Sequence, residues 1–169
     1  MNVIETERLI LRKGTNDDAP FFLDLLNQPS FIEFLGDRGV RNLDDARAYI
    51  QSKLVDSYNK FGFGLYMVLL KEDQTPIGIC GLIKRDGLDD VDIGFAFLPQ
   101  YASQGYGFES ASVVMEYGRN TFGLKKIVGI VSAGNVKSIG LLEKLGLKFE
   151  KMIKLPNDDE ELNLFVRTL

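Results

Sequence analysis

Hydrophobic positions follow two different periods along this chain, and the period changes near residue 62. In residues 19–27 and 42–60, apolar side chains recur every three or four positions, which predicts two amphipathic helices. From residue 63 onward, three apolar runs are separated by short polar segments with turn-like composition. These runs, at residues 63–70, 76–83 and 91–98, predict three strands of an antiparallel meander.

The remaining segments add strands and helices in alternation. Pro29 is expected to end the first helix, and residues 30–38 are expected to be irregular. Further strands are expected at residues 8–12, 126–131, 147–155 and 162–168, and further helices at 105–120 and 135–145. The predicted order β-α-α-β-β-β-α-β-α-β-β describes an α/β (α+β) fold with a mixed sheet, in one domain over residues 1–169.

The composition excludes several kinds of catalytic site. The 169 residues include no histidine, so a Ser-His-Asp or Cys-His nucleophile has no imidazole base. Histidine-ligated zinc is excluded for the same reason, and we expect no metal. The single cysteine, Cys80, rules out an intrachain disulfide, and its apolar strand indicates a small buried side chain rather than a nucleophile.

The net charge and the hydropathy of the chain limit which kinds of partner and which cellular location we expect. There are 24 acidic and 20 basic residues, a net charge of −4, whereas a non-specific nucleic-acid binder is normally basic. No apolar run has the length of a membrane span, and the first residues do not have the pattern of a signal peptide. We therefore expect a cytoplasmic protein that binds neither nucleic acid nor membrane.

A glycine-containing loop between a strand and a helix is the most informative motif. The strand at 91–98 leads into Gly105 and Gly107, where the next helix begins. Free backbone N–H groups at a helix N-terminus bind anions, and glycine lets a diphosphate approach closely. The alternative is a tight turn whose glycines only provide positive φ angles. A Rossmann fingerprint is nearly matched, but its βαβ context and ribose-binding acid are missing, and no P-loop motif occurs.

Four segments together resemble the GNAT superfamily of acyl-CoA N-acyltransferases, especially the Rim-type ribosomal-protein N-terminal acetyltransferases. They are, in chain order, residues 5–12, 44–50, 93–107 and 135–147. The resemblance covers nearly the whole chain. It implies a mostly antiparallel central sheet of about seven strands flanked by about four helices, and a homodimer is compatible with it.

The resemblance also implies a reaction, in which an amine attacks acetyl-CoA directly in a ternary complex. The acceptor would be a primary amine, either a protein N-terminus or a small molecule. The implied residues for acetyl-CoA are Phe95, Ala96, Phe97, Leu98, Ser103, Gln104, Gly105, Tyr106, Gly107, Phe108, Asn135 and Ser138. Two departures from the family pattern leave an alternative open, a non-catalytic acyl-CoA-binding sensor. Ala102 stands where a glutamine or arginine is usual, so the diphosphate would depend more on backbone donors and Gln104 than on a cation. Leu142 stands where many members have a tyrosine general acid.

Without histidine, the general base must be a carboxylate, a tyrosine or a relayed water. Asp92 is the first candidate, because strand alternation places it on the small-residue face with Gly94 and Ala96. Glu33 is the second, and Ser138 is expected near the thioester sulfur. The alternative for both acids is that they are ordinary solvated carboxylates. The alternative for Ser138 is that it is a polar helix residue without a catalytic role. The acidic segment 157–161 is either a solvated hairpin tip or a site that attracts a cationic acceptor.

Overall fold

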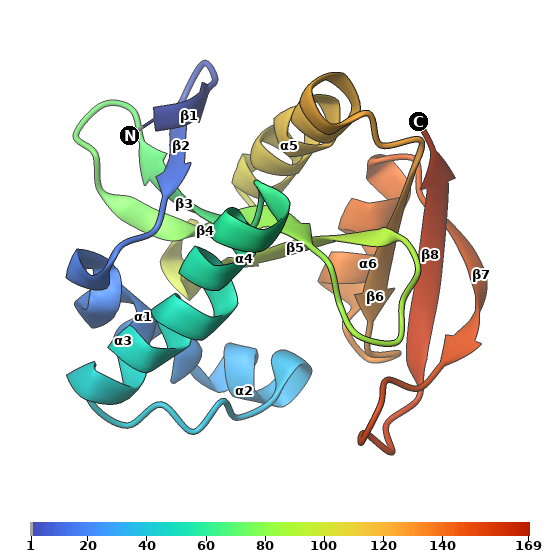
Figure 1. Cartoon of the computed structure of the whole chain (residues 1–169), viewed down its shortest axis with the longest axis horizontal. Helices are drawn as coiled ribbons and strands as arrows, with labels where there is room; N and C mark the ends of the chain where they lie inside the picture. Colours follow the sequence, from blue (N-terminus) through green and yellow to red (C-terminus); the bar gives the residue numbers. More distant parts are fainter. Residues whose placement is uncertain (1) are drawn as a thin grey trace.

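An eight-stranded mixed sheet forms the centre of the computed structural model, which describes residues 2–169 (Figure 1). Its strand order is β1-β2-β3-β4-β5-β6-β8-β7, and every neighbouring pair is antiparallel except β5 and β6. The strands are β1 (Asn2–Glu5), β2 (Leu9–Lys13), β3 (Leu65–Leu70), β4 (Pro76–Ile83), β5 (Val91–Phe97), β6 (Lys126–Val131), β7 (Lys148–Ile153) and β8 (Leu162–Thr168). The predicted class is confirmed, with one strand more than expected.

Helices cover both faces of this sheet. The α-helices are α1 (Ala19–Leu26), α2 (Pro29–Leu35), α3 (Leu43–Ile50), α4 (Asp56–Phe61), α5 (Tyr106–Phe122) and α6 (Val136–Lys144). Helices α1, α3 and α4 lie on one face, and α5 lies on the other (Figure 1). Within residues 2–169, no helix has both the length and the apolarity needed to cross a membrane.

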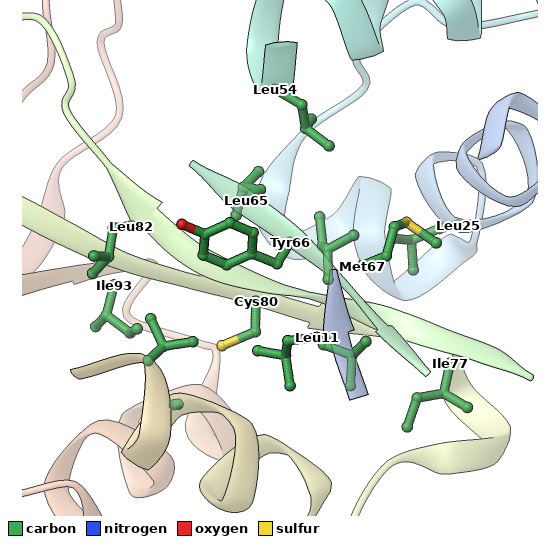
Figure 2. Packing of buried hydrophobic residues seen from close by; sticks show 14 of the residues in the cluster. Leu11, Leu25, Leu54, Leu65, Tyr66, Met67, Ile77, Cys80, Leu82 and Ile93 are labelled. Atoms are coloured by element: carbon green, nitrogen blue, oxygen red, sulfur yellow. The ribbon is translucent and has the colours of Figure 1, made fainter. Parts of the chain in front are cut away.

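The core lies on both sides of β3 and β4, whose side chains are almost all buried. Met67 of β3 points toward Leu25 of α1, on the face that α1, α3 and α4 cover (Figure 2). Cys80 of β4 points to the opposite face, toward α5 (Figure 2). Because it is fully buried, the pKa of the Cys80 thiol is raised to about 12, which fits the predicted role as a small apolar side chain.

Strands β5 and β6 separate shortly after they meet. They pair only at Val91 with Ile127 and at Asp92 with Val128. Beyond Asp92, β5 continues along β4 as far as Phe97, while β6 continues along β8. The split leaves one edge of β5 without a strand partner, so its backbone groups are available to other molecules.

Two elements near the N-terminus differ from the prediction. Strand β1 was not expected, because four residues are too short for a recognisable alternation. Helix α2 occupies most of the segment that we expected to be irregular. Pro29 ends α1, as predicted, but it also begins α2, because its fixed φ and missing N–H suit the first position of a helix.

The predicted helix over residues 42–60 is also interrupted. Helix α3 is capped by Asn42, whose side chain accepts a hydrogen bond from the backbone N–H of Asp45, and it runs to Ile50. A π-helical segment, Gln51–Val55, then separates α3 from α4. The apolar spacing stayed helical through the interruption, so the pattern gave no sign of it.

Candidate active site

Two cavities meet where β5 and β6 separate. The first, of about 630 Å³, is lined by Ser103, Gly105 and Gly107 of the β5–α5 loop, and we call it the loop cavity. The second, of about 520 Å³, is lined by Asp92, and we call it the Asp92 cavity. Both cavities share six lining residues, Phe31, Leu35, Phe95, Ala96, Asn135 and Ser138. They therefore adjoin at the middle of β5 and the beginning of α6, beside α2.

The loop cavity lies against the N-terminus of α5. The N-cap of this helix is Gly105, with φ of 87°, so no capping side chain bonds the free N–H groups of the first turn. Gly107 lines the cavity and also has a packing role. A Cβ there would lie 2.9 Å from Cδ2 of Leu141, so the absent side chain lets α5 and α6 pack closely. The unbonded N–H groups and the helix dipole favour an anion in this cavity.

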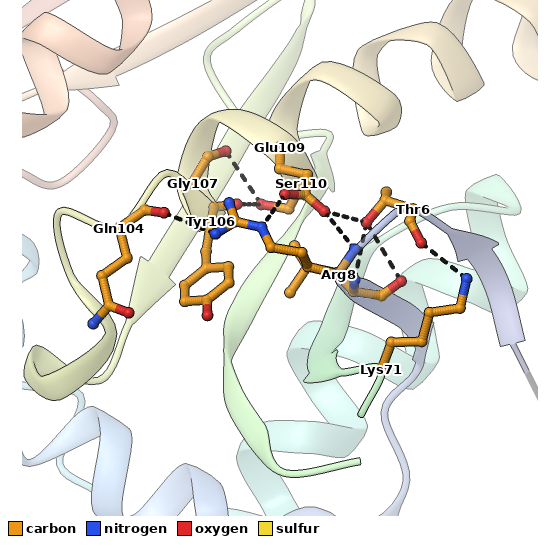
Figure 3. A network of polar contacts seen from close by, with 9 residues as sticks. Thr6, Arg8, Lys71, Gln104, Tyr106, Gly107, Glu109 and Ser110 are labelled. Atoms are coloured by element: carbon orange, nitrogen blue, oxygen red, sulfur yellow. Dashed lines mark hydrogen bonds and ion pairs between the residues drawn. The ribbon is translucent and has the colours of Figure 1, made fainter. Parts of the chain in front are cut away.

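The β1–β2 hairpin holds this loop in place (Figure 3). Arg8 donates from Nε to Oε1 of Glu109 at 2.7 Å and from Nη1 to the carbonyl of Gln104 at 3.1 Å. Its guanidinium lies 4.4 Å from the centre of the Tyr106 ring. Thr6 donates to Oε2 of Glu109 at 2.5 Å. Partial burial alone would raise the pKa of Glu109, but the hydrogen bonds from Thr6 and Arg8 hold it below its usual range.

The loop cavity contains basic side chains but no acidic ones. Lys137 and Lys144 are its charged lining residues, both from α6. The ammonium of Lys144 lies 4.4 Å from the centre of the Phe108 ring. Our sequence analysis missed both lysines, although their spacing of seven residues places them on one face of a helix. The cavity is thus suited to an anionic ligand although the whole chain is acidic.

The beginning of α6 contributes to both cavities. Asn135 is nearly buried, and its Oδ1 accepts a hydrogen bond from the backbone N–H of Ser138 at 3.3 Å, which confirms its capping role. Leu142 lines the Asp92 cavity from one turn further along. It is buried against Gly129 of β6, where a Cβ would lie 2.7 Å from Cδ2 of Leu142.

Asp92 is a buried carboxylate with one free oxygen. Its residue exposure is 1%, and its Oδ2 accepts a hydrogen bond from Nε of Arg85 at 2.6 Å. Its Oδ1 has no hydrogen-bond partner among residues 2–169. Burial raises the pKa of Asp92 to about 6, although the charge and hydrogen bond of Arg85 and the nearby backbone N–H of Ile130 act to lower it. A carboxylate with this pKa is deprotonated near neutral pH and can still accept a proton. Asp92, Gly94 and Ala96 line this cavity, together with Ile93 and Phe95.

Tyr49 of α3 also lines the Asp92 cavity. Burial raises the pKa of its hydroxyl, while the nearby charges of Arg38 and Arg85 oppose that rise. All three side chains line this cavity, although they lie far apart in the sequence. Our sequence analysis treated Tyr49 only as an apolar position of a helix, and nothing local indicated otherwise.

Some predicted site residues lie outside both cavities. Glu33 is exposed on α2 and lines neither cavity. Gln104 donates from its amide to the carbonyl of Gln100 at 2.9 Å, and Tyr106 lies under Arg8. Leu98 is buried and donates its N–H to Ile77 on β4. The other predicted residues for acetyl-CoA line the loop cavity: Phe95, Ala96, Phe97, Ser103, Gly105, Gly107, Phe108, Asn135 and Ser138.

The acidic segment between β7 and β8 does not supply charge to the Asp92 cavity. Leu155, Pro156 and Asn157 line that cavity, but none of the four acids that follow them does. Glu160 instead accepts a hydrogen bond from the hydroxyl of Ser132 at 2.8 Å. This contact ties the segment to the end of β6.

Comparisons with known proteins agree with this architecture. A family model described as an acetyltransferase (GNAT) domain matches residues 8–148. The N-acetyltransferase YnaD of Bacillus subtilis (strain 168) is 26% identical over 159 residues, which cover 93% of this chain and 90% of that protein.

Two solved structures show the same fold. An acetyltransferase from Agrobacterium tumefaciens str. C58 superposes with a TM-score of 0.85 at 24% identity, over 100% of this chain and 95% of that one. RimL, a ribosomal L7/L12 alpha-N-protein acetyltransferase in complex with coenzyme A, superposes with a TM-score of 0.85 at 16% identity, over 100% and 98% of the two chains. The expected structural resemblance to Rim-type enzymes is confirmed.

Proposed function

Because this chain belongs to the GNAT acetyltransferase family, we propose that it transfers an acetyl group from acetyl-CoA to a primary amine. One observation carries the proposal: a cavity with free helix N–H groups and two lysines adjoins a cavity with a buried, half-satisfied carboxylate. The first suits the phosphates of acetyl-CoA, and the second suits the amine.

The residues of the loop cavity fit coenzyme A in both charge and shape. The N–H groups at the start of α5, together with Lys137 and Lys144, are donors for the phosphates. The largely apolar lining, which includes Phe97 and Leu141, suits the pantetheine arm. The proposal is supported by these lysines, because they supply a cation from a different element although Ala102 provides none.

The split of the sheet provides donors for the reacting carbonyl. Leu98 donates its N–H to Ile77 on β4, so alternation points the N–H groups of Phe95 and Phe97 away from β4. That direction faces the gap between β5 and β6. An N–H there stabilises the negative charge that develops on the thioester oxygen during attack.

In the proposed step, the amine nitrogen forms a bond to the thioester carbon, the C–S bond breaks, and the thiolate leaves. Asp92 accepts the amine proton at its free Oδ1, directly or through one water. A thiol with a pKa of about 8.5 is a tolerable leaving group, so a strong general acid is not required. Ser138, which lines both cavities, is the proposed hydrogen-bond donor to the sulfur. Asp92 is preferred over Glu33, which lines neither cavity.

We propose that the acceptor is a protein N-terminus or a small-molecule amine, in a cytoplasmic setting. RimL is named for a ribosomal-protein substrate, and this is a property of that protein. Leu142, which left a non-catalytic module open, does not weaken the catalytic proposal, because Asp92 and Ser138 supply polar groups beside it.

The first test combines calorimetric binding of acetyl-CoA with release of free thiol in the presence of amines. We expect wild type to bind acetyl-CoA, and Lys144→Glu to weaken the affinity at least about tenfold, as expected when a charge-assisted contact to phosphate becomes a repulsion. Lys148→Glu is the matched control, because Lys148 is exposed on β7 and lines neither cavity.

We expect Lys148→Glu to bind within about twofold of wild type, as is usual for surface changes. No binding by wild type, or equal losses in both variants, would contradict the proposed acetyl-CoA site. Binding without thiol release for any amine would favour the non-catalytic module.

A further inference from the structure

We infer that the acceptor amine carries an anionic group, a carboxylate or a phosphate, close to the nitrogen that is acetylated. This inference rests on the proposed function and specifies its acceptor. It comes from the charges that line the Asp92 cavity, which have the opposite sign to the charge of the chain as a whole.

Basic side chains outnumber acidic ones around the Asp92 cavity. The basic lining residues are Arg38, Lys53, Lys60, Lys84 and Arg85, and the acidic ones are Asp56, Asp86 and Asp92. The chain as a whole has a net charge of −4. A cavity with an excess of positive charge concentrates anions and disfavours polyamines or lysine-rich segments.

The two arginines of this cavity have N–H donors that make no hydrogen bond within residues 2–169. Arg85 uses Nε for Asp92, and neither of its terminal nitrogens makes a hydrogen bond within residues 2–169. Arg38 forms no hydrogen bond or ion pair in that part of the chain, and its guanidinium lies 5.9 Å from the centre of the Phe31 ring. Guanidinium groups bind carboxylates and phosphates through paired N–H donors.

Arg38, Tyr49 and Arg85 line the same cavity from three different segments of the chain. The charges of both arginines also act to lower the pKa of the Tyr49 hydroxyl. Arg38 follows α2, Tyr49 lies in α3, and Arg85 follows β4. Two guanidinium groups and a phenol thus offer N–H and O–H donors to an anion in this cavity.

Arg85 connects the proposed anion site to the proposed base. Its Nε is 2.6 Å from Oδ2 of Asp92, while Oδ1 of the same carboxylate is free for the amine. An anion on the terminal nitrogens of Arg85 therefore lies near the amine that Asp92 deprotonates. This spacing suits an amino acid-like molecule or a peptide whose N-terminal residues include an acid.

The acidic segment 158–161 does not oppose this inference. Its side chains lie outside the cavity lining, and Glu160 is bound to Ser132. Lys84 contributes less than the arginines, because its ammonium donates to the carbonyls of Leu88 and Arg85.

The test compares acceptors that differ only in charge. The small-molecule arm uses β-alanine, its neutral amide and phosphoethanolamine. The peptide arm uses the tripeptide amides Ala-Glu-Ala, Ala-Gln-Ala and Ala-Lys-Ala. Thiol release gives kcat/KM for each. We expect the anionic member of at least one arm to exceed its neutral partner about tenfold or more, the value of one charge-assisted hydrogen bond.

Arg38→Gln is the informative variant, since Arg38 is exposed and its replacement leaves the core intact. We expect it to reduce the anionic-to-neutral ratio of kcat/KM about tenfold. The matched control, Arg119→Gln, removes the same charge from an exposed position of α5 outside both cavities and should leave the ratio unchanged. A preference for the neutral or the lysine-containing acceptor, or a ratio that Arg38→Gln does not change, would overturn the inference.

A binding measurement separates this inference from the proposed function. Calorimetry would compare N-acetyl-β-alanine and its amide on the protein saturated with coenzyme A, which requires no turnover. Tighter binding of the anion that Arg38→Gln abolishes would support the anion site even if no acetyl transfer occurred. Turnover without any charge preference would leave the proposed function intact and refute the anion site.

Discussion

At the scale of single residues, Asp92 combines two properties that oppose each other. Burial of a carboxylate favours its neutral form, and one guanidinium only partly compensates. Asp92 lines the cavity where the amine is proposed to bind, and its buried Oδ1 has no hydrogen-bond partner within residues 2–169. A carboxylate of this kind is less stable when charged than a surface aspartate, and that instability makes it a better base.

The first residue-scale prediction concerns Asp92→Asn and pH. We expect this variant to lower kcat/KM by about 10²–10⁴-fold, the usual contribution of a general base. In wild type, kcat/KM should fall as the pH decreases through about 6, because protonated Asp92 cannot accept the amine proton. Thiol release measured from pH 5 to 9 checks both effects.

The control for this prediction is Asp90→Asn, since Asp90 lines neither cavity and pairs with Lys126. It should keep the wild-type profile, and a matching loss there would point to a structural effect.

Denaturation gives a separate readout for Asp92. The pKa of Asp92 is higher in the folded protein than its unfolded value of about 3.9. Its contribution to the free energy of unfolding is therefore fully present below pH of about 3.9 and is lost as the pH rises through about 6.

At the scale of secondary-structure elements, two glycines show how closely helix α6 packs against strand β6. Gly129 of β6 lies under Leu142 of α6, and a Cβ added at this glycine would meet Cδ2 of that leucine at 2.7 Å. Gly140, also in α6, has open space within 4 Å of the place where its Cβ would lie. One glycine is therefore required by packing, while the other only weakens its helix.

We predict opposite effects for alanine at these two positions. Gly129→Ala should destabilise the fold by about 1–3 kcal/mol, because the buried Leu142 side chain must move to make room for the new Cβ. Gly140→Ala should stabilise it by about 0.5–1 kcal/mol through helix propensity. Urea denaturation of both variants checks the pair, and equal effects would contradict the described packing of α6.

The hairpin that holds the β5–α5 loop gives a second element-scale prediction. Glu109→Ala removes the acceptor for Thr6 and Arg8, and we expect a loss of about 1–2 kcal/mol in stability together with weaker binding of acetyl-CoA. Glu116→Ala, on an exposed part of the same helix, should cost less than about 0.5 kcal/mol. Chemical denaturation and calorimetry measure both. If Glu109→Ala bound acetyl-CoA as tightly as wild type, the hairpin would not support the loop.

The sequence predicted those elements and residues whose signals are local. The meander, the order of helices and the capping role of Asn135 follow from periods and caps within short windows. Asp92 was placed on the small-residue face by simple alternation. Lys144 was missed although its helical spacing was visible, because no sequence signal says which helix face borders a cavity.

Other features depend on contacts between distant segments. Tyr49 and Arg38 line the cavity with Asp92 only because segments far apart in the sequence fold together. Arg8 holds the β5–α5 loop through a hydrogen bond to Glu109, about a hundred positions away in the chain. Such contacts leave no periodic pattern, so a sequence without an alignment does not indicate them.

At the scale of the whole molecule, the sheet consists of two parts with a short connection. Strands β1–β5 form one part, and β6, β8 and β7 form the other. Only two residue pairs join β5 to β6, whereas the six pairs between β4 and β5 continue past them. A ligand in the loop cavity contacts β5 on one side and α6 on the other, so it bridges the two parts.

We therefore predict that coenzyme A slows amide hydrogen exchange on both sides of the split, in α6 and at the end of β5. At a concentration 100 times its Kd, it should raise the free energy of unfolding by about 2.7 kcal/mol. Hydrogen exchange followed by mass spectrometry measures the distribution. Protection confined to α5 would show that the ligand does not link the two parts.

The burial of Cys80 at the centre of β4 has a practical consequence for following the protein itself. A fully enclosed thiol with a pKa of about 12 does not react with disulfide reagents in the native state. The folded protein thus contributes no background to a colorimetric count of released coenzyme A. Once the sheet opens, the same thiol becomes a reporter at a single position, and its labelling rate records how often the middle of the molecule is exposed to solvent.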